Sequence, residues 1–212
     1  MIRHYDRRRQ GLAFGLAALA GYVDGLGFLA AGGFFTSFMS GNSTRLGVGL
    51  AHEAEAAIYA ASLIFSFVLG VVAGTLVSAI GPRRKTAVLA LVTVLLGAAA
   101  WMATGEAHPF APFVMALAMG AENLVFQRDG EVSLGVTYMT GALVKIGHHL
   151  GRALLGGPRW SWLAYLVLWL SLTSGAALGA VSYLELGPDA LWIAVAVALA
   201  FLPLAWSVEA DT

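Results

Sequence analysis

Long apolar stretches dominate this chain and decide which solvent it can fold in. A helix rises about 1.5 Å per residue, so a stretch of about 20 residues crosses the roughly 30 Å hydrocarbon core of a bilayer. Only 11% of the 212 residues are charged and 59% are hydrophobic, which leaves too little polar surface for a soluble domain. The sequence predicts an all-α integral membrane protein with spans at about 11–35, 56–80, 86–104, 109–127, 160–184 and 189–207.

Two further apolar stretches, at about 36–51 and 133–150, are shorter and more polar. Each contains Ser or Thr, Gly and one central cation, Arg45 or Lys145. Backbone that is not a continuous helix occurs at membrane depth only where protein or a water-filled cavity surrounds it. We therefore expect two broken or re-entrant half-helices, with short spans shielded by protein as the alternative.

The positions of Lys and Arg favour six full crossings. These residues are enriched in the cytoplasmic loops of membrane proteins. With six crossings and a cytoplasmic N-terminus, the outer loops contain no Lys or Arg, whereas crossing by both short stretches would place the basic cluster at 83–85 outside. The sequence therefore predicts that the N-terminus and the C-terminus are both cytoplasmic.

The chain aligns with itself at a shift of 100 residues. Residues 37–41 read Ser-Phe-Met-Ser-Gly and residues 137–141 read Thr-Tyr-Met-Thr-Gly. Upstream, Asp24 aligns with Asn123 at a shift of 99. An ordered series of matches of this kind predicts a duplication.

The duplication divides the chain into a first repeat, 1–104, and a second repeat, 105–212. Each repeat contains three crossings and one half-helix, and because three is odd the second repeat must be inverted in the membrane. Inverted repeats with broken helices near the midplane are typical of secondary transporters, whose substrate site lies between the repeats.

Two acidic residues within the spans are candidates for function. An ionised side chain in a membrane costs at least a few kcal/mol unless it is paired or wetted, so Asp24 and Glu122 are functional candidates by their placement. Proton coupling would act through such carboxyls, whereas a structural hydrogen bond or salt bridge is the alternative. The full predicted site consists of Asp24, Ser40, Gly41, Asn42, Arg45, Glu122, Asn123, Tyr138, Thr140, Gly141 and Lys145.

The two half-segments each begin with residues that favour helix N-caps, at 40–43 and at 140–141. Two half-helix N-termini that face each other would suit an anionic group or a polar solute, and the cation one turn further on would add positive charge. The alternatives are that the caps only satisfy backbone groups, and that the two cations neutralise the two acids.

Two glycine pairs, Gly70 with Gly74 and Gly175 with Gly179, have the spacing of close helix contacts. Such contacts form within one molecule or across a homodimer, so the sequence leaves a homodimer open.

Several functions find no support in the residues. The net charge of zero gives no field that would attract nucleic acid, and the chain has no cysteine. His148 and His149 lack a nearby ligand set, so no metal or cofactor is expected. The motifs of nucleophile elbows, phosphate loops and zinc helices are absent, so we do not expect an enzyme.

The chain resembles the YoaK-like family of bacterial inner-membrane proteins over nearly its whole length. That family has no assigned activity, so the resemblance implies a multi-pass protein of the bacterial inner membrane and no particular substrate. The residues that carry it are Gly-Tyr-Val-Asp at 21–24, Phe28 with Leu29, Met-Ser-Gly-Asn at 39–42, Leu46 with Gly47, Met119 with Gly120, Asn123, and Thr140 with Gly141.

The sequence departs from the family pattern at three positions. The family commonly has Thr at Ser40, an apolar residue at Arg45 and Gln at Glu122. The last two departures are charged and of opposite sign, which suggests that Arg45 and Glu122 form a compensating pair.

These observations predict that the protein moves a small solute across the inner membrane by alternating access around the two half-helices. An anion is slightly favoured as the solute, and proton coupling through Asp24 is an added hypothesis. A passive channel, and a membrane enzyme or assembly factor without transport, are the alternatives.

Overall fold

The computed structural model describes residues 6–104, 108–128, 131–132 and 137–210, and these form an almost entirely helical molecule. Its elements are α1 (Arg7–Ala30), α2 (Met39–His52), α3 (Ala54–Ala79), α4 (Arg84–Ala103), α5 (Ala111–Glu122), the 3₁₀ turn η2 (Asn123–Phe126), the short strands β1 (Gln127–Arg128) and β2 (Glu131–Val132), α6 (Met139–Leu154), α7 (Leu163–Leu186), the 3₁₀ turn η3 (Gly187–Ala190) and α8 (Leu191–Ala210).

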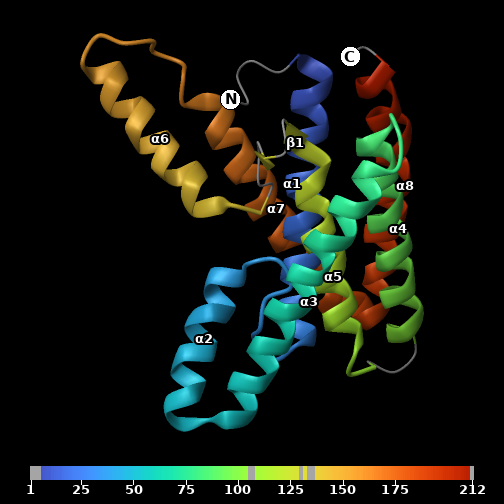
Figure 1. Ribbon diagram of the computed structural model, residues 1–212. Coiled ribbons are helices and arrows are strands. Elements are labelled where there is room, and N and C mark those ends of the chain that lie inside the picture. The colour runs from blue at the N-terminus through green and yellow to red at the C-terminus, as the bar shows by residue number, and fades with distance from the viewer. Residues whose placement is uncertain (1–5, 105–107, 129–130, 133–136, 211–212) are drawn as a thin grey trace.

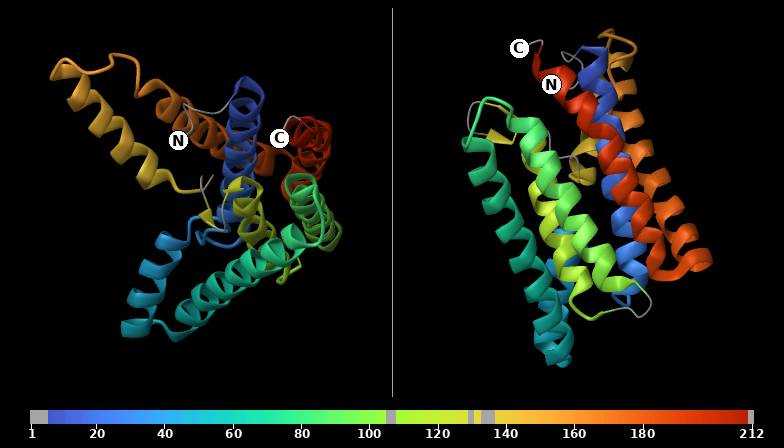
Figure 2. Two further views of the ribbon diagram at one scale, coloured as in Figure 1. Left: turned by 45° about the horizontal axis from the view of Figure 1, so that its top comes forward. Right: turned by 90° about the vertical axis from the view of Figure 1, so that its right-hand side faces the viewer.

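The apolar helices α1, α3, α4, α5, α7 and α8 stand side by side in a bundle (Figure 1). Helix α1 lies inside it, with buried residues along most of its length from Leu12 to Gly27. Figure 2 shows that α2 and α6 project from the same side of this bundle, each connected to the helix that follows it.

Four segments of the described chain are long and apolar enough to cross a membrane, namely α1, α3, α4 and the 47-residue segment Leu163–Glu209. The last contains both α7 and α8, and between them Gly187 has φ +60°, a conformation that favours glycine. Helix α5 with η2 forms a shorter apolar helix, Ala111–Phe126. The all-helical, membrane-type fold expected from the sequence is therefore present.

Close backbone contacts hold two pairs of helices together. A Cβ atom at Gly175 would overlap the carbonyl oxygen of Ala18, so α7 lies directly on α1. A Cβ atom at Gly70 would overlap the carbonyl oxygen of Leu117, so α3 lies directly on α5. The contacts predicted from the glycine pairs are confirmed within one molecule, because small residues allow main chains to approach.

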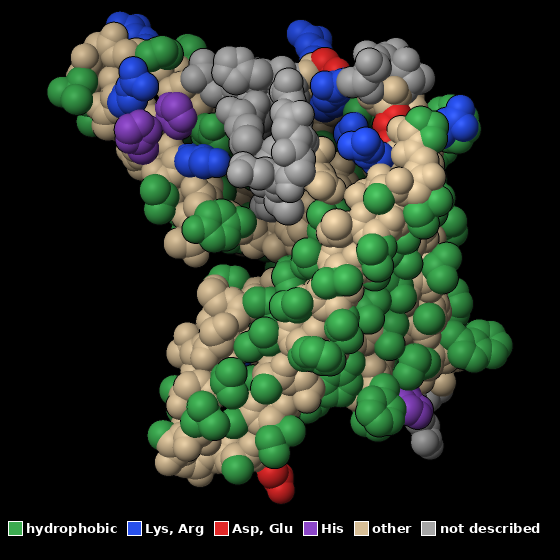
Figure 3. Space-filling view, in the orientation of Figure 1, with side chains coloured by type: hydrophobic (Ala, Val, Ile, Leu, Met, Phe, Trp, Pro, Cys, Tyr) green, Lys and Arg blue, Asp and Glu red, His purple; other side chains and the backbone are tan. Residues whose placement is uncertain are grey.

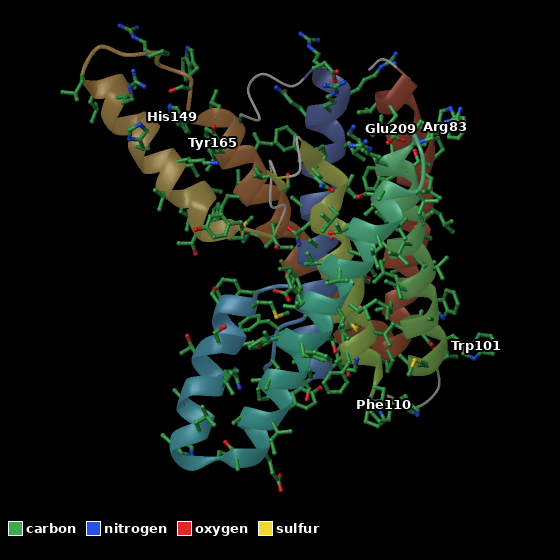
Figure 4. All side chains as sticks on the ribbon, viewed as in Figure 1. Arg83, Trp101, Phe110, His149, Tyr165 and Glu209 are labelled. Carbon is green, nitrogen blue, oxygen red and sulfur yellow. The ribbon has the colours of Figure 1, made fainter. Side chains whose placement is uncertain are left out.

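The last turn of α8 joins the first turn of α4. The Glu209 carboxylate accepts hydrogen bonds from the amide of Lys85, from the amide of Thr86 at 3.2 Å and from the Thr86 hydroxyl at 2.6 Å. The guanidinium of Arg83 lies 3.4 Å from the centroid of the Trp206 ring. Figure 4 shows Glu209 and Arg83 together at the end of the bundle that holds both termini.

Replacing Glu209 with alanine is expected to lower the free energy of unfolding by about 1 to 2 kcal/mol. The carboxylate satisfies first-turn amides of α4 and lies at the positive end of its dipole, as an N-cap side chain does. Thermal unfolding of the purified protein in detergent measures the loss. Glu53→Ala is the matched control, because Glu53 makes no side-chain cap hydrogen bond; an equal loss in both variants would contradict this role for Glu209.

Candidate functional site

The starts of α2 and α6 face a single pocket near the middle of the molecule. It has a volume of about 230 Å³, below the roughly 300 to 1,000 Å³ of pockets for drug-sized ligands. Figure 3 shows the molecule hollowed between these two projecting arms. The pocket is lined by aligned residues of the two halves together with one residue of α3: Ser37, Phe38, Met39, Ser40, Thr137, Tyr138, Met139, Thr140 and Phe67.

Asp24 fixes the loop that leads into α2. Its carboxylate, only 8% exposed, accepts hydrogen bonds from the amides of Thr36 at 2.8 Å and Ser37 at 2.7 Å. The Thr36 hydroxyl lies 3.3 Å from the same oxygen. Asp24 therefore stands behind the pocket-lining loop and positions its backbone.

Asn123 contacts the segment that leads into α6 through a side chain. Its side-chain oxygen accepts a hydrogen bond from the Thr137 hydroxyl at 3.2 Å, and its amide donates to the carbonyl of Met119 at 3.0 Å. The aligned residues Asp24 and Asn123 thus each anchor a loop that lines the one pocket, although neither residue lines it directly.

Asn42 is fully buried and clamps the backbone of Phe35. Its side-chain oxygen accepts a hydrogen bond from the Phe35 amide at 3.0 Å, and its amide donates to the Phe35 carbonyl at 2.7 Å. At the bend before α2 the Asn42 side chain thus supplies the hydrogen bonds that a neighbouring main chain would otherwise make to the N–H and C=O of Phe35.

The predicted N-caps at 40–43 and 140–141 are wrong. The helices begin earlier, at Met39 and Met139, their N-cap residues are Phe38 and Tyr138, and neither makes a side-chain cap hydrogen bond. The polar residues instead lie inside the first turns, where the hydroxyls of Ser43 and Thr44 donate to the carbonyls of Met39 and Ser40, four residues earlier. The predicted half-segment from 133 also includes residues 133–136, which lie outside the described residues.

The first turns of α2 and α6 leave polar groups for the pocket. Ser40 and Thr140 are exposed, and their hydroxyls have no hydrogen-bond partner among the described residues. Gly41 and Gly141 lie under the rings of Phe38 and Tyr138, where an added Cβ atom would collide. These two glycines therefore allow the aromatic rings to fold over the helix starts.

The two cations of the predicted site lie against aromatic rings. The Arg45 guanidinium lies 4.6 Å from the centroid of Phe34, and the Lys145 ammonium lies 5.3 Å from the centroid of Tyr165. The expected compensating pair with Glu122 is wrong, because Arg45 is held by the loop before α2 through this cation–π contact.

Glu122 lies at the end of α5 and is completely buried. Neither of its carboxylate oxygens has a hydrogen-bond partner among the described residues. Among the described candidates it is therefore the one whose buried polar atoms the fold leaves unsatisfied, which is costly unless the site has a use for them.

Sequence reasoning missed several pocket residues, including Ser37, Met39 and Thr137. The signal was present, because all three lie in the aligned segments of the two halves. Phe67 carried no signal, since its place follows from the packing of α3 on α5. Within the described residues, no three His, Asp or Glu side chains gather as a metal site would require.

Comparison with known proteins gives a family without an assigned activity. The family model described as "Protein of unknown function (DUF1275)" matches residues 12–204. The UPF0700 transmembrane protein RA0705 of Rhizobium meliloti (strain 1021) is 37% identical over 212 residues, which cover 97% of this chain and 92% of that protein. The UPF0700 transmembrane protein YoaK of Bacillus subtilis (strain 168) is 27% identical over 142 residues, 62% of each chain. No solved structure matches.

Proposed function

The chain belongs to the DUF1275 family of proteins of unknown function, and we propose that it moves a small polar solute across a bacterial inner membrane. The observation that carries this proposal is the pocket at the facing starts of α2 and α6, which draws equivalent residues from both halves of the chain. A pocket between the repeats at mid-depth of an apolar bundle is the usual place of a substrate site in transporters built from repeats, and the Ser and Thr hydroxyls of this one supply hydrogen-bonding groups.

The helix contacts support two inverted repeats with six crossings. The first helix of each half packs on the third long element of the other half, α1 on α7 and α5 on α3. Each half-helix packs on the helix after it, and the two last helices, α4 and α8, pack together. An exchange of the halves 1–104 and 105–212 reproduces this set of contacts, as a twofold axis in the membrane plane would.

Charge supports a cytoplasmic position for both termini. Most of the Lys and Arg side chains visible in Figure 3 gather at the end of the bundle that holds the termini. The positive-inside tendency assigns that end to the cytoplasm.

The pocket chemistry favours a small neutral or anionic solute. Its lining contains no Asp, Glu, Lys or Arg, and its hydrogen-bonding groups are hydroxyls at the starts of two helices. Helix N-termini carry a partial positive charge that favours anions. Because the lining has no charged side chain, charge selection falls to the two helix dipoles.

The arrangement of the arms suits alternating access. Helices α2 and α3 form one hairpin and α6 and α7 form the other, and the pocket lies where the two meet (Figure 1). Rocking of one hairpin against the other would open the pocket first to one side of the membrane and then to the other. Glu122 is the better candidate for proton coupling, because its oxygens have no partner among the described residues, whereas Oδ1 of Asp24 accepts hydrogen bonds from the amides of a loop.

The test is thermal unfolding of the purified protein with a panel of small anions, neutral metabolites and cations. A solute that binds the folded state raises the unfolding temperature by mass action. We expect one solute class to stabilise the wild type and to lose this effect in the double variant Ser40→Ala/Thr140→Val. Ser62→Ala is the matched control, because its exposed hydroxyl bonds to a carbonyl of its own helix and lies outside the pocket.

Two outcomes would contradict the proposal. One is the absence of any solute-dependent shift at millimolar concentrations, which would favour an assembly factor or another role without transport. The other is a shift that persists unchanged in the double variant. For a solute that does bind, uptake into liposomes that rises linearly without saturation would identify a passive channel instead.

A further inference from the structure

Helix α6 carries its basic residues along one side. His148 and His149 lie three and four residues after Lys145, and Arg152 lies four and three residues after them, which places all four on one face of a helix. We call these four residues the basic stripe. Helix α6 contains no Asp or Glu, so the charge of the stripe is not balanced within its own helix.

The rest of α6 is apolar and mostly uncovered. Ala142 is its one buried residue, and Leu143, Val144 and Leu154 are 48%, 65% and 89% exposed. An uncovered apolar helix surface in a membrane protein contacts lipid chains. The basic stripe therefore lies beside an exposed apolar surface that contacts lipid chains.

The stripe borders the contact between α6 and α7. The ring of His149 stacks on Tyr165 with centroids 5.2 Å apart, and the Lys145 ammonium lies 5.3 Å from the same ring. Figure 4 shows His149 and Tyr165 facing each other between the two helices. Lys145, His148 and Arg152 are exposed, so they are open to a ligand from the surroundings.

The Arg152 end of the stripe lies toward the lipid headgroups. Helix α6 starts at the central pocket, and at about 1.5 Å per residue Arg152 is about 20 Å further along its axis. Because α6 is inclined to the bundle, the gain in depth is smaller than this length (Figure 1). Half of a bilayer's hydrocarbon core is only about 15 Å thick. Trp160, which is 71% exposed, follows shortly after and suits the interface between lipid and water.

The other half-helix shows that the stripe is not a feature of the repeat. The positions in α2 that align with the stripe are Arg45, Val48, Gly49 and His52. Only Arg45 among them is always charged, and it lies over Phe34. The cations accumulate on the half-helix that runs toward the end of the bundle rich in Lys and Arg (Figure 3).

We propose that the basic stripe binds the phosphate of an anionic phospholipid in the leaflet at the end of the bundle that holds both termini. The phosphate lies between Lys145 and Arg152, and the acyl chains follow the exposed apolar surface of α6. Basic sites beside transmembrane helices on the cytoplasmic side bind anionic headgroups by this combination of charge and hydrocarbon contact. The proposal does not depend on whether the protein transports a solute.

The test compares the full-length protein in neutral detergent with equal mole fractions of phosphatidylglycerol or phosphatidylcholine. We expect phosphatidylglycerol to raise the unfolding temperature more, and we expect the difference to shrink at about 0.5 M salt, where charges are strongly screened. The variant Lys145→Gln/Arg152→Gln should lose the difference and retain fewer phosphatidylglycerol molecules in native mass spectrometry. The matched control Arg7→Gln/Arg84→Gln removes two exposed cations from the same end of the bundle and should retain both effects.

Three results would overturn the proposal. Equal stabilisation by the two lipids would show no preference for anionic headgroups. A preference that survives in the stripe variant, or that disappears equally in the control, would place the effect elsewhere or in net charge. Equal stabilisation by free glycerol phosphate would show that the stripe binds a soluble anion. Both variants are compared with their own unfolding temperature in phosphatidylcholine, so a change in basal stability does not obscure the result.

Discussion

Alanine in place of Gly175 or Gly70 is expected to destabilise the protein strongly. The added Cβ atom would overlap the carbonyl oxygen of Ala18 in the first case and of Leu117 in the second, and neither backbone atom can move without separating two helices. Overpacking of this kind costs roughly 1 to 3 kcal/mol or more, a large share of the 5 to 15 kcal/mol that stabilises a typical fold. The yield of monodisperse protein and its unfolding temperature measure the effect.

Gly97→Ala is the matched control for both substitutions. Gly97 lies within α4, and no atom outside its own helix lies within 4 Å of the added Cβ. Alanine there is expected to be neutral or to stabilise by up to about 1 kcal/mol, since alanine has the higher helix propensity. If Gly175→Ala and Gly97→Ala unfolded at the same temperature, the close contact of α1 with α7 would not be needed for the fold.

The glycine pairs also show how far sequence reasoning reaches. The spacing of Gly70 with Gly74 and of Gly175 with Gly179 correctly predicts close helix contacts, because small residues four apart lie on one helix face. The spacing does not say which helix is met. The pairing of α7 with α1 and of α3 with α5 depends on the packing of the whole bundle. Several apolar helices could pack on a small-residue surface about equally well, so the spacing alone does not select one.

The alignment of the two halves pointed to the segments that line the pocket, but not to the roles of their residues. The alignment of 37–41 with 137–141 pointed to the two helix starts that now line one pocket. The roles of single residues could not be read in this way. The Asp24 carboxylate accepts hydrogen bonds from backbone amides 12 and 13 residues further along the chain. Residue type alone does not distinguish an aspartate that holds a loop from one that binds an ion.

The charged residues show the same limit. Opposite charges at Arg45 and Glu122 suggest a pair, yet the structure holds Arg45 over Phe34 and leaves the Glu122 carboxylate without a hydrogen-bond partner. A cation–π contact within a loop depends on the loop's path, which periodicity does not specify. The unsatisfied carboxylate is visible only once its surroundings are known.

The substitution Asn42→Ala is expected to destabilise the protein by roughly 2 to 5 kcal/mol. It removes both hydrogen bonds to Phe35 and leaves a partly buried N–H and C=O without partners, each of which costs about 1 to 3 kcal/mol. Asn42→Asp should recover part of the loss, since its carboxylate still accepts from the Phe35 amide but no longer donates to the carbonyl.

Ser43→Ala separates the clamp from a general effect on α2. Ser43 is the next residue of α2, is exposed, and donates its hydroxyl only to the carbonyl of Met39 in its own helix. Its replacement should change stability by no more than about 0.5 kcal/mol. Thermal unfolding ranks the variants, and the expected order of stability is Ser43→Ala, then Asn42→Asp, then Asn42→Ala. An Asn42→Ala protein as stable as Ser43→Ala would mean that the loop before α2 keeps its path without the clamp, and the pocket would then need another explanation for its shape.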